Sequence, residues 1–309
     1  MNRVSTSGTY QSALLNLMNA QGRQDEAQTR LSTQKNATDM AGFGRGAESL
    51  TTLKAASGRV QTFLDTGEAV AARLDTQDQA LNQIGDGVGA ARAAIGDVLA
   101  SESADVLMLE LQNQFQSIQN GLNAEHQGVY LFGGANTGQA PVNVQTMSQL
   151  TAAPTIASTF TNDTLVPTSR LGEGRSVQTG YLASDVGTQI FQIFKDIQAY
   201  NDDPATGPLT GKPTDAQKTF LTAQLSRLDA ASSATIEVIA RNGSLAKQVE
   251  TTNTSHAAQV ESLETMVNSK TDADLARALT DLQLSQVAVQ ASAQVLTKLN
   301  ESSLLNYLR

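Results

Sequence analysis

The placement of proline constrains this sequence more than any other feature. All six prolines fall between Pro141 and Pro213, and residues 1–140 and 214–309 contain none. Because a proline inside a helix removes a backbone hydrogen bond and clashes with the preceding turn, proline-free stretches permit long helices. The sequence therefore predicts two long helical flanks around a middle of different character.

About a third of the apolar residues of the chain are alanine. Hydrophobic residues make up 40% of the sequence, but 42 of them are alanines, and aromatic residues make up only 4%. A core built from such side chains is thin, although a chain of this length can bury a sizeable one. This composition favours helices packed along their length over a compact enzyme built around one deep cleft.

Charge and composition also exclude several classes of protein. The net charge is −9, with 21 basic and 30 acidic residues and no basic stripe, so we expect no nucleic-acid partner. No apolar run approaches the ~20 residues of a membrane span, so we expect no membrane insertion. The absence of cysteine removes disulfides and thiol nucleophiles. The first residues carry no apolar segment, so we expect no cleaved signal peptide.

The N-terminal flank carries an apolar seam at coiled-coil spacing. A helix is predicted over about residues 10–31, and residues 32–48 are predicted to form a glycine-bearing loop. The seam positions alternate by three and four residues: Tyr10, Ala13, Leu17, Ala20, Gln24, Ala27 and Leu31.

The C-terminal flank carries a seam of the same kind. Thr271 to Asp274 fits a capping box that begins the last helix. The stripe then alternates by four and three residues: Leu275, Leu279, Leu282, Gln286, Val289, Ala293, Leu296 and Asn300. The simplest architecture brings the two ends of the chain together as antiparallel helices, with a β-rich insert at the far tip.

Further helices are predicted between the two ends, over about 47–99, 104–128, from 184, and from 214. Three glycines, Gly85, Gly87 and Gly89, interrupt the first of these, which indicates either a bend or the close packing of a neighbour. Residues 134–183 contain short β-prone runs at 142–144, 159–161 and 165–166, typical of a small β-rich insert. The predicted fold is mainly α, a long antiparallel helical bundle or coiled coil of the N- and C-terminal segments with a small β-rich insert.

No residue pattern supports catalysis, a cofactor or a metal. The glycine-rich stretch 39–46 follows no strand and lacks the lysine of a phosphate-binding loop. His126 and His256 are 130 positions apart without the carboxylates typical of a metal site. Asp202 and Asp203 fit a turn better than acid–base chemistry. We therefore expect no catalytic, cofactor-binding or metal-binding residues, and a protein that is not an enzyme.

Four stretches of the sequence carry a family resemblance. They are Arg3-Val4-Ser5-Thr6, the turn Tyr130-Leu131-Phe132-Gly133-Gly134 after Asn123, Leu171 to Val177, and the C-terminal run from Asp274 to Leu308. With these stretches the chain resembles the bacterial flagellin superfamily, and within it the hook–filament junction proteins (the hook-associated protein 3 family). Residues 32–41 depart from the usual family pattern, which weakens a match to ordinary filament flagellin.

The resemblance implies a structural role in the bacterial flagellum. Proteins of this kind join the hook, through hook-associated protein 1, to the flagellin filament by helical polymerisation, and copies of the chain would form a ring. It also implies export through the flagellar type III apparatus, with an export chaperone covering the C-terminal helix. The expected location is extracellular, at the hook–filament junction.

The resemblance further implies three parts. Residues 1–40 with 270–309 form a terminal coiled-coil core, residues 41–133 with 184–269 a helical rod, and residues 134–183 the outer insert. The predicted assembly residues are Tyr10, Ala13, Leu17, Leu31, Leu275, Leu279, Leu282, Val289, Leu296, Leu304, Leu305 and Leu308. Two alternatives stay open: a filament flagellin, and a long coiled-coil module for signalling or protein interaction.

Overall fold

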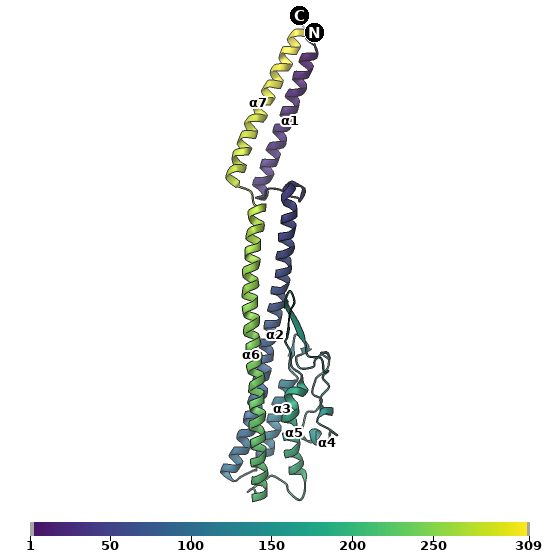
Figure 1. Cartoon of the computed structure of the whole chain (residues 1–309), viewed down its shortest axis with the longest axis vertical. Helices are drawn as coiled ribbons and strands as arrows, with labels where there is room; N and C mark the ends of the chain where they lie inside the picture. Colours follow the sequence, from purple (N-terminus) through teal and green to yellow (C-terminus); the bar gives the residue numbers. More distant parts are fainter. Residues whose placement is uncertain (1–2, 308–309) are drawn as a thin grey trace. The chain divides into compact units, whose positions relative to one another are not determined.

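A computed structural model describes residues 3–307 and, for side chains, residues 8–301. The chain is mainly helical with two small antiparallel sheets, as predicted (Figure 1). The elements in chain order are α1 (Arg3–Thr33), η1 (Ala41–Gly46), α2 (Ala47–Ser101), α3 (Leu107–Leu122), β1 (Glu125–His126), β2 (Val129–Tyr130), α4 (Met147–Ala152), η2 (Ala157–Thr159), β3 (Thr168–Gly172), β4 (Arg175–Gln178), α5 (Ala183–Asp202), α6 (Asp215–Thr271) and α7 (Leu275–Tyr307). Every proline lies outside these helices and strands.

The chain divides into two compact units. The terminal unit contains residues 1–59 and 259–309, and the central unit contains residues 60–258. Long helices belong to both, because α2 begins in the terminal unit and α6 ends there.

The central unit holds the main core. Helix α3 buries an apolar stripe at helical spacing, made of Leu107, Leu111, Phe115, Ile118 and Leu122. The ring of Phe115 lies 5.1 Å from that of Phe191 and 5.7 Å from that of Phe194, both from α5. Such aromatic pairs stabilise a core beyond the area that they bury. The few large side chains of this sequence are therefore concentrated where three or more helices meet.

Helix α2 is continuous through its three glycines, and close packing explains one of them. A Cβ atom at Gly87 would stand 2.6 Å from Cγ1 of Ile118, which lies on α3. On α3 itself, a Cβ atom at Gly121 would stand 2.8 Å from Cγ1 of Ile84. By contrast, nothing lies within 4 Å of a Cβ placed at Gly89. The glycines at 87 and 121 allow α2 and α3 to approach closely.

This packing predicts opposite effects for two alanine substitutions two residues apart. Gly87→Ala should lower the free energy of unfolding by about 1–3 kcal/mol, because the new methyl group overpacks the contact with Ile118. Gly89→Ala should raise it by about 0.5–1 kcal/mol, since alanine is the better helix former and has free space there. Urea unfolding followed by circular dichroism measures both, and a stabilised Gly87→Ala variant would contradict the packing argument.

The insert is less regular than predicted. Residues 142–144 and 159–161 meet only through an isolated bridge between Val142 and Phe160, and residues 165–166 form no strand. The regular β-structure is the antiparallel β3–β4 hairpin, which contains a bulge between Arg170 and Gly172. Apolar residues of the insert, including Met147 and Leu150 of α4, are buried in the same core as α3 and α5. The insert is therefore packed on the helices of the central unit.

A charged cluster joins the end of α2 to the connection before α6. The carboxylate of Glu102 lies 2.7 Å from Nζ of Lys212 and 2.5 Å from Nζ of Lys218. Hydrogen bonds and charge from these two lysines lower the pKa of Glu102 to about 2. Backbone contacts close the same region, where Ala104 N donates to the carbonyl of Gly211 at 2.8 Å.

The lowered pKa predicts where acid weakens this junction. The stabilisation by Glu102 is fully present above its unfolded pKa of 4.5 and is lost as the pH falls towards about 2. The side-chain carboxyl resonance of Glu102 should therefore titrate near pH 2 in an NMR experiment. In the Lys212→Ala/Lys218→Ala variant its midpoint should move up towards 4.5; an unmoved midpoint would show that the lysines are not the cause.

Candidate assembly interface

Helices α1 and α7 form an antiparallel hairpin whose interior is built from small side chains (Figure 1). Among residues 8–33 and 275–301 of these helices, the fully buried apolar residues are Ala20, Ala27 and Ala278, and Ser285 is also buried. Alanine buries little apolar area, so the hairpin gains little free energy from its own interior. Its larger apolar side chains are partly buried or exposed among the described residues.

The predicted seam positions of α1 differ in burial. Ala20 and Ala27 are fully buried. Ala13, Leu17 and Leu31, which lie before and after them on the same face, are partly buried, whereas Tyr10 is 40% exposed. The 3-4 spacing read from the sequence is thus the spacing of the inward face over residues 13–31.

The predicted seam of α7 was placed in part on the wrong face. Leu282, Val289 and Leu296 are partly buried, but Leu275 and Leu279 are 44% and 49% exposed. The inward face instead alternates larger and smaller residues: Ala278, Leu282, Ser285, Val289, Ser292, Leu296 and Leu299. The physical reason is that small residues on the inward face let the two helices approach closely. Leu275 and Leu279 therefore lie on the exposed surface of α7.

The last predicted seam residues are not tested. Leu304 and Leu305 lie within the backbone of α7, but their side chains are outside the described residues, and Leu308 lies outside them altogether.

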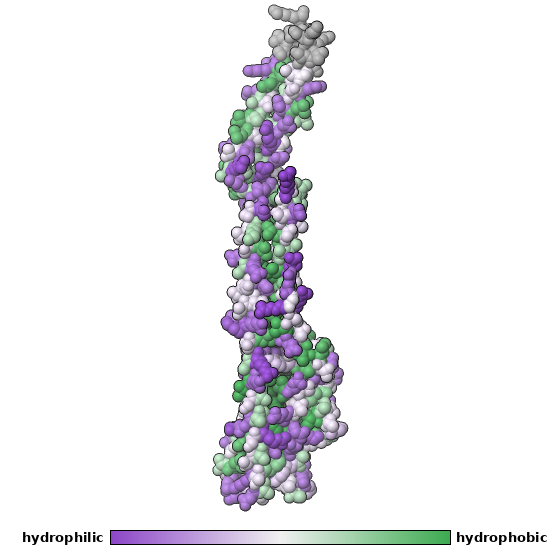
Figure 2. Space-filling model, viewed as in Figure 1, coloured by the Kyte–Doolittle hydropathy of each residue, from purple (hydrophilic) through white to green (hydrophobic). Residues whose placement is uncertain are grey.

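Apolar side chains are exposed on the outer surfaces of the hairpin (Figure 2). Helices α1 and α7 carry nine of the sixteen large apolar side chains that are exposed among the described residues: Tyr10, Leu14, Leu15, Met18, Leu275, Leu279, Leu284, Val287 and Val295. At about 100° per residue, Leu275 and Leu279 lie on one flank of α7, and Leu284, Val287 and Val295 lie on the other. Helix α7 is therefore apolar on its inner face and on both flanks.

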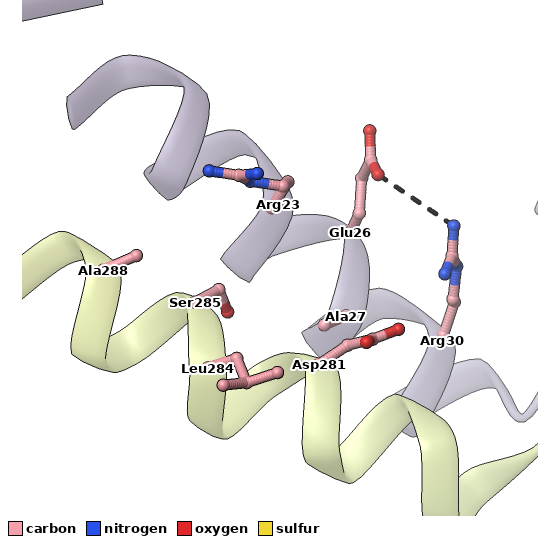
Figure 3. A pocket seen from close by; sticks show the side chains of 8 residues that line it. All are labelled: Arg23, Glu26, Ala27, Arg30, Asp281, Leu284, Ser285 and Ala288. Carbon is pink, nitrogen blue, oxygen red and sulfur yellow. Dashed lines mark ion pairs between the residues drawn. The ribbon is translucent and has the colours of Figure 1, made fainter. Parts of the chain in front are cut away.

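A shallow groove runs between the two helices on one side of the hairpin (Figure 3). Its volume is ≈ 440 Å³, and it is lined by Arg23, Glu26, Ala27, Arg30, Asp281, Leu284, Ser285 and Ala288. Small residues form its floor, Leu284 forms an apolar wall, and Glu26 and Arg30 form an ion pair at 4.0 Å on its rim. This shape can accept a large apolar side chain of a neighbour, and no nucleophile with an adjacent base lies in it.

The other residues considered from sequence have structural contacts. Nδ1 of His126 is 2.8 Å from the hydroxyl of Thr76, and Nε2 of His256 is 2.8 Å from the carbonyl of Leu171. The amide of Gly42 donates to the carboxylate of Asp39 at 2.8 Å, so this carboxylate closes the glycine-rich turn. Within residues 3–307 the structure contains no group of three or more potential metal ligands and no helix apolar enough over its length to cross a membrane.

The family turn joins α3, the insert and α5. Leu131, Phe132, Gly133 and Gly134 are buried, and Tyr130 is partly buried. The carbonyl of Phe132 accepts from Ala183 N at 3.0 Å, and the carbonyl of Gly133 accepts from Asp163 N at 3.1 Å. Gly134 has φ +69°, and a Cβ there would stand 3.0 Å from the carbonyl of Asp163, so glycine is required. The turn is a packing element of the central unit.

Comparison with known proteins bears on the resemblance seen in the sequence. Residues 216–308 match the family described as the bacterial flagellin C-terminal helical region. No curated protein sequence matches the chain. The matched segment contains all of α6 except Asp215 and all of α7.

Solved structures share the fold. A protein of Vibrio parahaemolyticus described as a flagellar hook-associated protein aligns with a TM-score of 0.59 at 14% identity, over 76% of this chain and 99% of that one. Bacillus cereus FlgL aligns with a TM-score of 0.54 at 14% identity, over 71% of this chain and 98% of that one. The match of residues 216–308 and the shared fold agree with the resemblance to the flagellin superfamily that the sequence shows.

The thin interior of the hairpin predicts low local stability in the isolated chain. In dilute monomer, amides of residues 275–300 should exchange about two or more orders of magnitude faster than those of α5, whose apolar face is fully buried. Exchange of α7 should slow when the protein assembles. Hydrogen–deuterium exchange with mass spectrometry measures both states, and protection of α7 equal to that of α5 in the monomer would contradict the argument.

Proposed function

We propose that this protein is a non-enzymatic structural component of the bacterial flagellum, an adaptor that joins the hook to the flagellin filament by helical polymerisation. The observation that carries the proposal is the exposed apolar surface on both flanks of α7 and on α1. Each such side chain contributes about 1.5–3 kcal/mol when it is buried. The hairpin leaves nine such side chains exposed, so it gains more free energy from burying them against neighbouring subunits than from its own interior.

The arrangement of these side chains supports open-ended assembly. A subunit in a helical array contacts neighbours through two different surfaces, because a head-to-tail contact must be made on opposite sides. Two apolar flanks on one helix provide such a pair. In this proposal hook-associated protein 1 lies on one side of a ring of copies of this chain, and flagellin adds to the other side, outside the cell.

The proposal includes the three-part division and the export route. Residues 1–40 with 270–309 would form the inner core, residues 41–133 with 184–269 the surrounding rod, and residues 134–183 the outer insert. A chain exported unfolded would need its C-terminal helix covered beforehand, and the exposed apolar flanks of α7 fit an export chaperone on that helix.

Filament flagellin is the second candidate, favoured by the match of residues 216–308 to the flagellin C-terminal region. The structural likeness to hook-associated proteins supports the adaptor instead. The two functions differ in the phenotype of a deletion, since a filament subunit supplies the filament itself and an adaptor supplies only its base.

Genetic complementation tests both the adaptor function and the role of the apolar flank of α7 that contains Leu284 and Val287. Cells that lack this protein should release flagellin into the medium and build no filament, and the unaltered chain should restore filaments. Leu284→Glu/Val287→Glu should fail to restore them, because charge on this flank blocks apolar docking. Ile236→Glu, an equally drastic change at a 61% exposed site of the central unit, should restore them.

Folding and export are checked by circular dichroism and by detection of each variant in the culture medium. Filaments on cells without the protein would contradict the adaptor function. Full restoration by the Leu284→Glu/Val287→Glu variant would leave the function standing and remove this flank of α7 from the interface.

A further inference from the structure

The two connections that lead into the α1–α7 hairpin are paired with each other. Residues 34–36 follow α1, and residues 270–273 link α6 to α7, both within the terminal unit. Asn36 N donates to the carbonyl of Thr271 at 2.7 Å, and Ala273 N donates to the carbonyl of Gln34 at 2.9 Å. Lys35 and Asp272 face each other in an antiparallel bridge. We call this arrangement the clasp.

Side chains reinforce the clasp from both connections. Nζ of Lys35 donates to the carboxylate of Asp272 at 2.5 Å and to the hydroxyl of Thr271 at 3.4 Å. Nδ2 of Asn36 donates to the carbonyl of Asp272 at 2.8 Å and to that of Lys270 at 3.3 Å. Backbone and side-chain hydrogen bonds together therefore hold the segment that follows α1 against the segment that precedes α7.

The hairpin needs such a pin because its interior specifies register weakly. Ala20 and Ala27 are seven residues apart on α1, and Ala278 and Ser285 are seven residues apart on α7. A slide of one heptad, about 10.5 Å, therefore sets small side chains opposite small side chains again. Small buried side chains alone leave the observed register and the register shifted by one heptad close in free energy. The hydrogen bonds of the clasp can form only in the observed register.

We propose that the clasp sets the register of α1 against α7, with Asn36 and the Lys35–Asp272 pair as positioning residues. Register decides which exposed side chains stand side by side across the two helices, including the wall and rim of the groove in Figure 3. Its consequence for docking rests on the proposed function, but the register itself does not. The clasp thus shapes the assembly surface through the alignment of the two helices that carry it.

Paired cysteines in the full-length chain, which has none of its own, read the register directly. Ala27 and Ser285 line the same groove and are both buried, so Ala27→Cys with Ser285→Cys reports the observed register. Ala27→Cys with Ser292→Cys reports a slide of one heptad. A short bis-maleimide crosslinks purified protein, and mass spectrometry gives the ratio of shifted to unshifted product.

Lys35→Glu places a carboxylate against Asp272 and should raise this ratio at least tenfold. Lys35→Glu/Asp272→Lys restores opposite charges and should return it to the parental value. Asn36→Ala, which removes two side-chain bonds without a change of charge, should raise the ratio in the same direction. Lys298→Glu, a matched charge change on α7 away from the clasp, should leave it unchanged.

Two results would overturn the proposal. One is an unchanged ratio in both Lys35→Glu and Asn36→Ala. The other is the loss of both products in either variant, which would mean that the pairing holds the hairpin together without choosing its register. Because the ratio is read on purified protein, neither result depends on whether the chain acts at the hook–filament junction.

Discussion

The packing of small side chains between long helices is the constraint on which the rest of this structure depends. Apolar stabilisation scales with the area removed from water, and an alanine-lined contact removes little. The central unit compensates with Phe115, Phe191 and Phe194, which meet where several helices converge. Among its described residues, the α1–α7 hairpin fully buries only the small apolar side chains of Ala20, Ala27 and Ala278, and several of its leucines are exposed.

The two units also fix the register of their helices by different means. In the central unit Nε2 of Gln77 donates to Oδ1 of Asn242 at 2.8 Å, and Nδ2 of Asn242 donates to the carbonyl of Leu74 at 3.1 Å. Gln77 and Asn242 are fully buried, and a buried polar pair of this kind favours one alignment because any slide leaves it without partners. The hairpin interior has no comparable pair among its described residues. Its register is pinned at one end, by the clasp.

Sequence periodicity predicted the helices well and their faces less well. The absence of proline and the 3-4 spacing located α1, α2, α6 and α7, since both follow directly from helix geometry. The phase of α7 was misjudged because large residues were assumed to point inward, whereas Leu275 and Leu279 lie outside and Ala278 and Ser285 inside. The clasp was missed because residues 35 and 272 are far apart in sequence and a backbone bridge has no periodic signal. Of the capping box predicted there, only Asp274 caps α7, accepting from Arg277 N at 3.1 Å.

The two flanks of α1 differ in chemistry, and this difference bears on the kind of assembly. One flank carries Arg23 and Arg30 at the groove, and the opposite flank carries Tyr10, Leu14 and Met18. A closed two-fold dimer of the coiled-coil signalling type needs one self-complementary patch and satisfies itself with two copies. The two flanks of α1 differ in chemistry, and both flanks of α7 are apolar. The pairing of two copies through one patch would therefore leave apolar surface uncovered. The same surface is fully used only when each copy has a different neighbour on each side, which is the contact pattern of a ring or a helical array.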